Sequence, residues 1–345
     1  MQINRRHRIE ISIVLGLVLF AGGSIGFGLF VGLDEIWANL KQIHPILIIQ
    51  LLALSLLNFG LRAVRWHLFC RHLNLQIPFF RAVRTYLSGW ALMVTPAKAG
   101  EGIRLWLINQ SKGHPYRLLA PLIVADRECD ALAFVIILIF AVGSFSAYTF
   151  PIFGFDSPYW VVVSIFSAYV FLKLILIYNT RALRNFIGFC HRLSRFRFRR
   201  FWASVRTGVR ATRKLFDLKI LIPSMVLSLA GWVAEFAALW LILQAFETPV
   251  PMVTIAFIFI FAMSVGAASL LPGGLGGVEA TMALLLGVIG VGHSEALTAT
   301  IVIRTTTFWF AVGVGVLLLP MLVRRVRHER KERLAHARHP HRLHH

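Results

Sequence analysis

The sequence predicts an all-α polytopic integral membrane protein with about six transmembrane helices plus two re-entrant hairpins made of broken helices. Its composition is the first reason, because 57% of the residues are hydrophobic and only 15% are charged; soluble domains average about 45–50% and about 25%. The second reason is that the hydrophobic residues form runs of about 20, the length that crosses a bilayer core. The third is that two further runs are interrupted by proline and glycine, which do not continue a helix.

The formal net charge of +21 comes from short basic blocks between the hydrophobic runs. This distribution follows the positive-inside rule and suits anionic head groups, and no nucleic-acid recognition motif accompanies it. We therefore expect anionic membrane lipids as partners and no nucleic acid. Cys70, Cys129 and Cys190 have no paired spacing, so we expect free thiols.

The first half, residues 1–178, begins with a retained span behind the basic segment Asn4–Arg8. Its second span runs into arginines that predict a cytoplasmic connector: Arg62, Arg65, Arg71, Arg81 and Arg84. A break at residues 95–101 then separates two arms too short to span, which predicts a hairpin that enters and leaves on the cytoplasmic side. The predicted segments are spans 11–33 and 45–66, hairpin 86–109, and spans 118–150 and 159–178.

The connector, residues 179–219, holds twelve Lys and Arg residues against one acid, Asp217. Its alternation of arginine with phenylalanine would suit an RNA-binding arm. An amphipathic cytoplasmic segment on anionic lipid explains the same pattern and is our preferred interpretation, because the segment joins two spans.

The second half, residues 220–320, repeats the pattern of the first. A span over 220–245 precedes a hairpin with a break at 271–279, and the final span covers 296–320. A basic, His-rich tail follows at 321–345. Histidines without Cys or carboxylate partners are a weak metal signal, so we expect no metal and no cofactor.

The two breaks share one sequence pattern: in each, a glycine lies four residues after the proline and a glutamate comes soon after. The prolines are Pro96 and Pro272. The hairpins enter from opposite sides, which is typical of inverted-topology repeats in secondary transporters. We place both termini in the cytoplasm, the protein in the cell (inner or plasma) membrane, and Lys41 alone among the basic residues outside.

Three arginines next to or within apolar runs are candidates to bind a phosphate, because their planar fork binds two oxygens: Arg104, Arg127 and Arg304. Glu101 and Glu279, at the breaks, could counter these arginines, bind a cationic group or carry a proton. The backbone N–H groups of Gly276 and Gly277 would attract anionic oxygens.

Four further acids are candidates for coupling or ion pairing: Asp126, Glu128, Asp130 and Glu235. A purely structural interpretation competes with these roles. Glu101 and Arg104 are three residues apart and can neutralise each other on one helix face. The Asp126–Asp130 cluster can likewise be an ion-paired knot.

The order of these motifs resembles the flippase-like family, also called the lysylphosphatidylglycerol synthase transmembrane region. The resemblance covers nearly the whole chain and rests on Leu61-Arg62-Ala63-Val64-Arg65-Trp66, Thr95-Pro96 with Gly100-Glu101-Gly102-Ile103-Arg104, Asp126-Arg127-Glu128 with Asp130, Pro272-Gly273-Gly274-Leu275-Gly276 with Glu279, and Arg304. The sequence departs from the family at Asp126-Arg127-Glu128, where Glu-Arg and an apolar residue are usual. Lys98 stands where a basic or small residue is common, and we include it among the substrate-binding candidates.

The resemblance implies a non-enzymatic membrane lipid transporter, since we expect the translocating module without the acyltransferase domain that follows it in some relatives. Its substrate would be a lipid with a phosphate or charged head group, such as a phospholipid or polyprenyl phosphate, moved by alternating access. One alternative is an intramembrane transferase on a polyprenyl-phosphate lipid, with Glu101, Asp126 or Glu279 as base. Another is a scaffold for lipid-synthesis enzymes; a homo-oligomer or such an enzyme is the expected protein partner.

Overall fold

The structure is a computed structural model of the 345-residue chain. It describes residues 33–95, 100–142, 199–269 and 271–338, with positions 164, 167–172, 175 and 179; side chains are described for these residues except 33, 141–142, 199–206 and 334–338. Several predicted features therefore lie outside the described residues. They are residues 11–32 of the first span, most of the span 159–178, Lys98 and the end of the tail.

All regular secondary structure in the described residues is helical. The α-helices are α2 (Leu33–Gln42), α3 (Pro45–His72), α4 (Phe79–Ser88), α5 (Gly102–Lys112), α6 (Tyr116–Val142), α9 (Arg199–Leu215), α10 (Leu218–Ala245), α11 (Met252–Ala268), α12 (Gly277–Val288), α13 (His293–Arg304) and α14 (Phe310–Arg338). Short 3₁₀ turns η1 (Gly89–Leu92) and η5 (Pro272–Gly274) and a π-helical turn η6 (Thr305–Trp309) lie between them. The all-α prediction is confirmed.

Three helices in the described chain are long and apolar enough to cross a membrane: α3, α10 and the continuous helix His293–Arg333. With 27 residues, α6 also has the length, about 40 Å at 1.5 Å per residue, but it carries ionisable side chains midway. A membrane protein is thus confirmed in outline. The number of six spans, the division into halves and the inverted repeat stay predictions.

The second helix is longer than predicted, because α3 continues to His72 rather than ending near Trp66. Arg62 and Arg65 consequently lie inside the helix and are buried. The predicted end of the helix near Trp66 is wrong, and the cytoplasmic side of the connector that follows stays a prediction. A prediction from hydropathy places the end of a span near the first charged residues. In the structure, carboxylates of another helix neutralise these two arginines, so the helix continues.

The second break forms where glycine is required. Gly273, Gly274 and Gly276 have φ angles of 64°, 69° and 82°, the left-handed region that a residue with a Cβ avoids. The flanking helices α11 and α12 have 17 and 12 residues, so each is shorter than the roughly 30 Å hydrocarbon core. The arms of the first break, α4 with η1 and α5, are short as well. Whether either pair is re-entrant stays a prediction.

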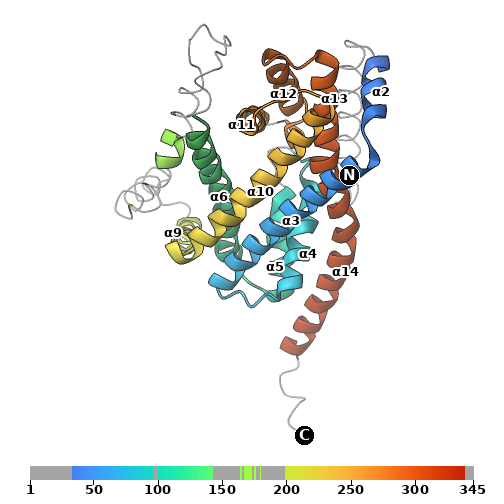
Figure 1. The fold of residues 1–345 in the computed structure, drawn as a ribbon. Helices are drawn as coiled ribbons and strands as arrows, with labels where there is room; N and C mark the ends of the chain where they lie inside the picture. Colours follow the sequence, from blue (N-terminus) through green and yellow to red (C-terminus); the bar gives the residue numbers. More distant parts are fainter. Residues whose placement is uncertain are drawn as a thin grey trace.

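The centre of the fold is the long pair α3 and α10, which lie side by side across the molecule (Figure 1). Helices α11, α12, α13 and α2 gather at one end of this pair, α4 and α5 lie toward the other, and α6 packs against α10 and α11. The last helix, α14, packs against α4, η1 and α5 and carries the chain to its C-terminus. Residues far apart in sequence therefore meet between α3, α6, α10 and α13.

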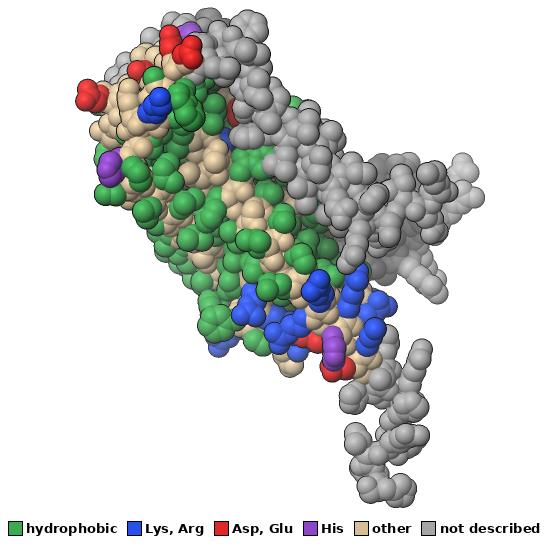
Figure 2. Space-filling view, turned by 90° about the vertical axis from the view of Figure 1, so that its right-hand side faces the viewer, with side chains coloured by type: hydrophobic (Ala, Val, Ile, Leu, Met, Phe, Trp, Pro, Cys, Tyr) green, Lys and Arg blue, Asp and Glu red, His purple; other side chains and the backbone are tan. Residues whose placement is uncertain are grey.

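The surface has the layered character of a membrane protein. Figure 2 shows a band of hydrophobic side chains with Lys and Arg gathered at the end near the C-terminus. The exposed basic residues of this end include Arg324, Arg325, Arg327, Arg330 and Lys331. Asp34, Glu35 and Lys41 lie on α2 at the opposite end (Figure 1). This polarity agrees with the expected topology, while the side that faces the cytoplasm stays a prediction.

The described part of the basic connector is α9, and it packs against α6. Ala211 and Leu215 are buried, whereas Arg210, Arg213 and Lys214 are exposed. The helix is thus amphipathic as predicted, with its apolar face used inside the protein. Binding of its basic face to anionic lipid stays a prediction.

Candidate functional site

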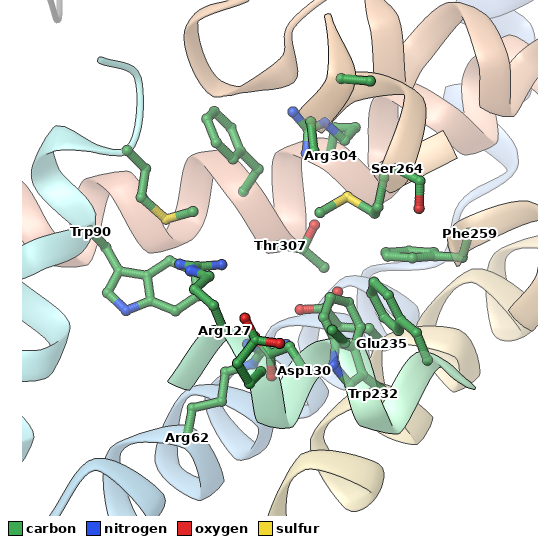
Figure 3. A pocket seen from close by; sticks show the side chains of 18 of the residues that line it. Arg62, Trp90, Arg127, Asp130, Trp232, Glu235, Phe259, Ser264, Arg304 and Thr307 are labelled. Carbon is green, nitrogen blue, oxygen red and sulfur yellow. The ribbon is translucent and has the colours of Figure 1, made fainter. Parts of the chain in front are cut away.

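A cavity of about 580 Å³ is lined by residues of α3, α4, η1, α5, α6, α10, α11, α13 and η6. The arginines predicted to bind phosphate, Arg104, Arg127 and Arg304, all line it. In Figure 3, Arg127, Asp130 and Glu235 face this space from one side, and Arg304 and Thr307 face it from the other. Tertiary packing therefore brings together charges that lie on separate helices.

Aromatic and apolar side chains form the rest of the wall. They include Trp90, Phe134, Trp232, Phe259 and Met263. Ala267 and Ala268 of α11 also line the cavity and are exposed, so the cavity reaches the molecular surface at the C-terminal end of this helix. A charged centre with apolar walls and an opening at the surface suits an amphiphilic ligand.

Arg104 is the least satisfied charge of the cavity. Its side chain is 1% exposed, and neither Nε nor Nη1 donates a hydrogen bond to any described residue. Its Nη1 lies 3.6 Å from Asp126 Oδ2, and its guanidinium carbon lies 4.0 Å from the centroid of the Tyr86 ring. A buried donor without an acceptor is costly, and an anionic oxygen in the cavity would satisfy it.

Gly89 makes the space that Arg104 occupies. A Cβ at this position would overlap Nε and Cγ of Arg104. The glycine begins η1, directly after α4, so the turn brings bare backbone against the arginine side chain. Sequence reasoning missed Gly89, because its neighbour comes from another helix.

Arg127 binds Glu101 and not a solvent-facing group. Its Nε donates to Glu101 Oε2 over 3.2 Å, and its Nη2 donates to the other carboxylate oxygen. The Glu101 side chain is buried, whereas that of Arg127 is 36% exposed. The alternative in which Glu101 neutralises Arg104 is therefore wrong: the two side chains point to different partners.

Arg304 binds Glu279 at the second break. Its Nε donates to Glu279 Oε1 over 2.6 Å, and its Nη2 donates to the carbonyl oxygen of Gly273 over 3.3 Å. Glu279 Oε2 accepts the N–H of Gly276 over 2.8 Å. This amide is thus already used within the protein, in contrast to the open N–H expected there. Neither Gly276 nor Gly277 lines the cavity.

A buried charge network stands behind the cavity and includes two arginines that sequence reasoning left out of the site. Arg65 is 0% exposed and donates to Asp126, Asp130 and Ser228. Arg62 lines the cavity and donates to Asp130 Oδ2 and Asn58 Oδ1, both over 2.8 Å. The sequence did contain a signal for this network. Two arginines lie three residues apart in one apolar run, and two aspartates lie four residues apart in another.

Asp126 and Asp130 are therefore ion-paired as the structural interpretation expected, but with Arg62 and Arg65 of α3, while Arg127 of the same segment pairs with Glu101. Glu128 is buried and lines the cavity. Glu235 of α10 also lines the cavity, and its Oε1 accepts a hydrogen bond from Asn58 Nδ2. Among the described residues, no group of His, Cys, Asp and Glu has the arrangement of a metal site.

Comparison with known proteins agrees with this architecture. The family described as "Lysylphosphatidylglycerol synthase TM region" matches residues 11–339. A UPF0104 membrane protein of Methanothermobacter thermautotrophicus is 25% identical over 333 residues, which cover 91% of this chain and 96% of the relative. A UPF0104 membrane protein of Pyrococcus horikoshii is 20% identical over 305 residues, which cover 82% and 91%.

Proposed function

Because the chain belongs to the family of the lysylphosphatidylglycerol synthase transmembrane region, we propose that it transports a phosphate-bearing lipid head group between the leaflets. The family supports a membrane location and a lipid-related role. Transport is our proposal, and the cavity carries the argument for it.

The single observation that supports this function best is the unsatisfied Arg104. A buried guanidinium whose Nε and Nη1 donate no hydrogen bond, placed in a cavity, is a receptor for an anionic oxygen. A phosphate placed there would also meet the partly exposed Arg127. The guanidinium carbon of Arg104 lies over the rings of Tyr86 and Trp66, and these cation–π contacts help to fix its position.

The size of the cavity suits a head group rather than a whole lipid. Its volume, about 580 Å³, falls in the range of roughly 300–1,000 Å³ usual for small-molecule sites. The opening beside Ala267 and Ala268 would let acyl or prenyl chains stay outside while the head group enters. Contacts with the arginines would then compensate for the water that the head group loses on entering the cavity.

The broken helices supply the parts that would move. Glu101 and Glu279 each fix the start of a short helix to an arginine of the following helix. Discontinuous helices beside a central binding site are typical of alternating access. Driving force would come from a lipid gradient or from a coupled ion.

The alternative of an intramembrane transferase fits the geometry less well. Its candidate bases were Glu101, Asp126 and Glu279, and all three form ion pairs with arginines. Each of these carboxylates is thus already engaged by an arginine of the protein. Detection of a chemically converted lipid would favour this alternative over transport.

The test uses purified protein in liposomes that carry a fluorescent phospholipid or polyprenyl-phosphate lipid in both leaflets. Dithionite bleaches the outer leaflet, so loss of fluorescence beyond that half measures translocation. We expect wild type to exceed the outer half and Arg104→Gln to stop there. Arg213→Gln, on the exposed face of α9, is the matched control and should behave as wild type. No translocation of any lipid class by wild type would refute the proposal and favour a scaffold.

A further inference from the structure

Glu235 differs from the other acids around the cavity. Glu101, Asp126, Asp130 and Glu279 each form an ion pair with an arginine. The Glu235 side chain instead accepts its hydrogen bond from Asn58, a neutral amide, and no Lys or Arg of the described chain forms an ion pair with it. It is 9% exposed and lies in the cavity wall.

The charged groups that face Glu235 come from three neighbouring helices. They are Arg62 of α3, Asp130 of α6 and Arg304 of α13. Arg62 forms an ion pair with Asp130 and Arg304 forms one with Glu279, so each arginine contacts another carboxylate and acts on Glu235 only through space. Trp232 of its own helix and Phe259 of α11 complete the apolar wall (Figure 3). An ionised carboxylate is costly in such surroundings, and binding a proton removes that cost.

A continuous chain of contacts joins Glu235 to the anion site. Glu235 accepts from Asn58, whose Oδ1 accepts from Arg62, and Arg62 and Arg65 both donate to Asp130. Arg65 also binds Asp126. Asp126 is in turn the carboxylate 3.6 Å from Arg104. The charge on Glu235 and the charge held by Arg104 are therefore parts of one network in a medium of low dielectric.

We propose that Glu235 is a proton-binding site whose occupancy is linked to head-group binding, so that an anionic lipid moves together with a proton; this rests on the proposed lipid transport. A negative head group in the cavity favours the neutral carboxyl form of Glu235. By linkage, protonation of Glu235 favours binding of the anion by the same factor. The step is proton binding from water on one side and release on the other, without redox chemistry.

The first experiment measures protonation without transport. Dicyclohexylcarbodiimide modifies protonated carboxyl groups in apolar surroundings, and mass spectrometry identifies the modified peptide. We expect Glu235 to be modified at neutral pH and to be protected at alkaline pH. The reaction should be stronger in vesicles of phosphatidylglycerol than in vesicles of phosphatidylcholine. Asp130, held by two arginines, is the internal control and should not react. Glu235 that stays unmodified at every pH would refute the proton site.

The second experiment measures the linkage in liposomes with an internal pH dye. Wild type should show proton uptake that depends on anionic lipid, and its lipid affinity should fall by up to about tenfold per pH unit on the alkaline side, the limit for one linked proton. Glu235→Gln, which keeps the hydrogen bond to Asn58, should bind lipid with no pH dependence and lose the proton movement. Glu235→Asp should retain both.

The two proposals fail in different ways. Lipid translocation by wild type with the same pH profile in Glu235→Gln would overturn the proton linkage and leave transport intact. Carbodiimide labelling of Glu235 that follows pH but not lipid composition would overturn the linkage as well. Absence of any lipid movement together with lipid-dependent labelling would overturn transport and support the linked proton site.

Discussion

Arg304 Nε lies 2.6 Å from Glu279 Oε1, and the other oxygen of the same carboxylate accepts the N–H of Gly276. One side chain thus fixes both the glycine break and the arginine that lines the cavity. At the first break Glu101 likewise pairs with an arginine of the following helix, Arg127, while the N–H of Gly100 donates to Thr95 Oγ1. The partners are 26 residues apart in the first pair and 25 in the second, and the division into repeated halves stays a prediction.

Removing Glu279 should destabilise the protein more than removing Arg304. The Arg304 side chain is 5% exposed and that of Glu279 is 21% exposed, so Glu279→Gln leaves the more buried charge without a partner. Loss of one partner of a buried pair costs about 3–5 kcal/mol. Thermal unfolding in detergent should show a larger loss for Glu279→Gln than for Arg304→Gln, with the double variant less destabilised than the sum. Additive effects would contradict a direct pair.

Arg104 and Arg65 should respond to substitution in different ways. Arg65 has partners in Asp126, Asp130 and Ser228, so Arg65→Gln leaves Asp126 without its hydrogen-bonded arginine and Asp130 with Arg62 alone, and it should cost about 3–5 kcal/mol. Arg104 has only the 3.6 Å ion pair with Asp126, and neither its Nε nor its Nη1 donates a hydrogen bond, so Arg104→Gln should cost less stability than Arg65→Gln while lipid binding is lost. Unfolding temperature and lipid binding measured on the same preparations separate the two effects. Equal destabilisation would mean that Arg104 is structural.

Gly89→Ala should weaken lipid binding through Arg104. The added methyl group would overlap the arginine side chain and force the guanidinium out of its place beside Tyr86. We expect a loss of lipid affinity that approaches the loss in Arg104→Gln. Gly60→Ala is the matched control, because a Cβ at Gly60 of α3 meets nothing within 4 Å. Unchanged affinity in Gly89→Ala would show that the position of the guanidinium is unimportant.

Glu329 should hold the last helix with a weak and salt-sensitive contact. It accepts hydrogen bonds from Arg81 of α4, Ser111 of α5 and Arg325 of its own helix. Its side chain is 25% exposed, and exposed ion pairs contribute about 0–1 kcal/mol. Glu329→Gln should therefore change unfolding temperature little but increase protease cleavage near the C-terminus, and high salt should have the same effect in wild type.

The orientation can be tested with single cysteines at the two ends. Cys70 and Cys129 are buried, so they should react slowly, and Cys190→Ala removes the third thiol. A membrane-impermeant maleimide should label Lys41→Cys from outside intact cells. It should label Arg325→Cys only after permeabilisation. Labelling of both from outside would contradict the predicted topology.

The sequence by itself determined the helical segments and the places where they break. Hydropathy, proline and glycine act locally: α10 begins and ends within two residues of its predicted bounds, and the second break falls at the glycines that adopt positive φ. The choice of Arg104, Arg127 and Arg304 as site residues also followed from the sequence, because a charge inside an apolar run needs a reason to be there.

The tertiary structure decided which charges meet. Glu101 pairs with Arg127 rather than with its helix neighbour Arg104, and Asn58 reaches Glu235 across 177 positions. Arg62 and Arg65 are buried in a charge network because two aspartates of α6 pair with them. The pairing of a buried charge depends on the distance and dielectric set by helix packing, and neither quantity is contained in a local pattern of residues.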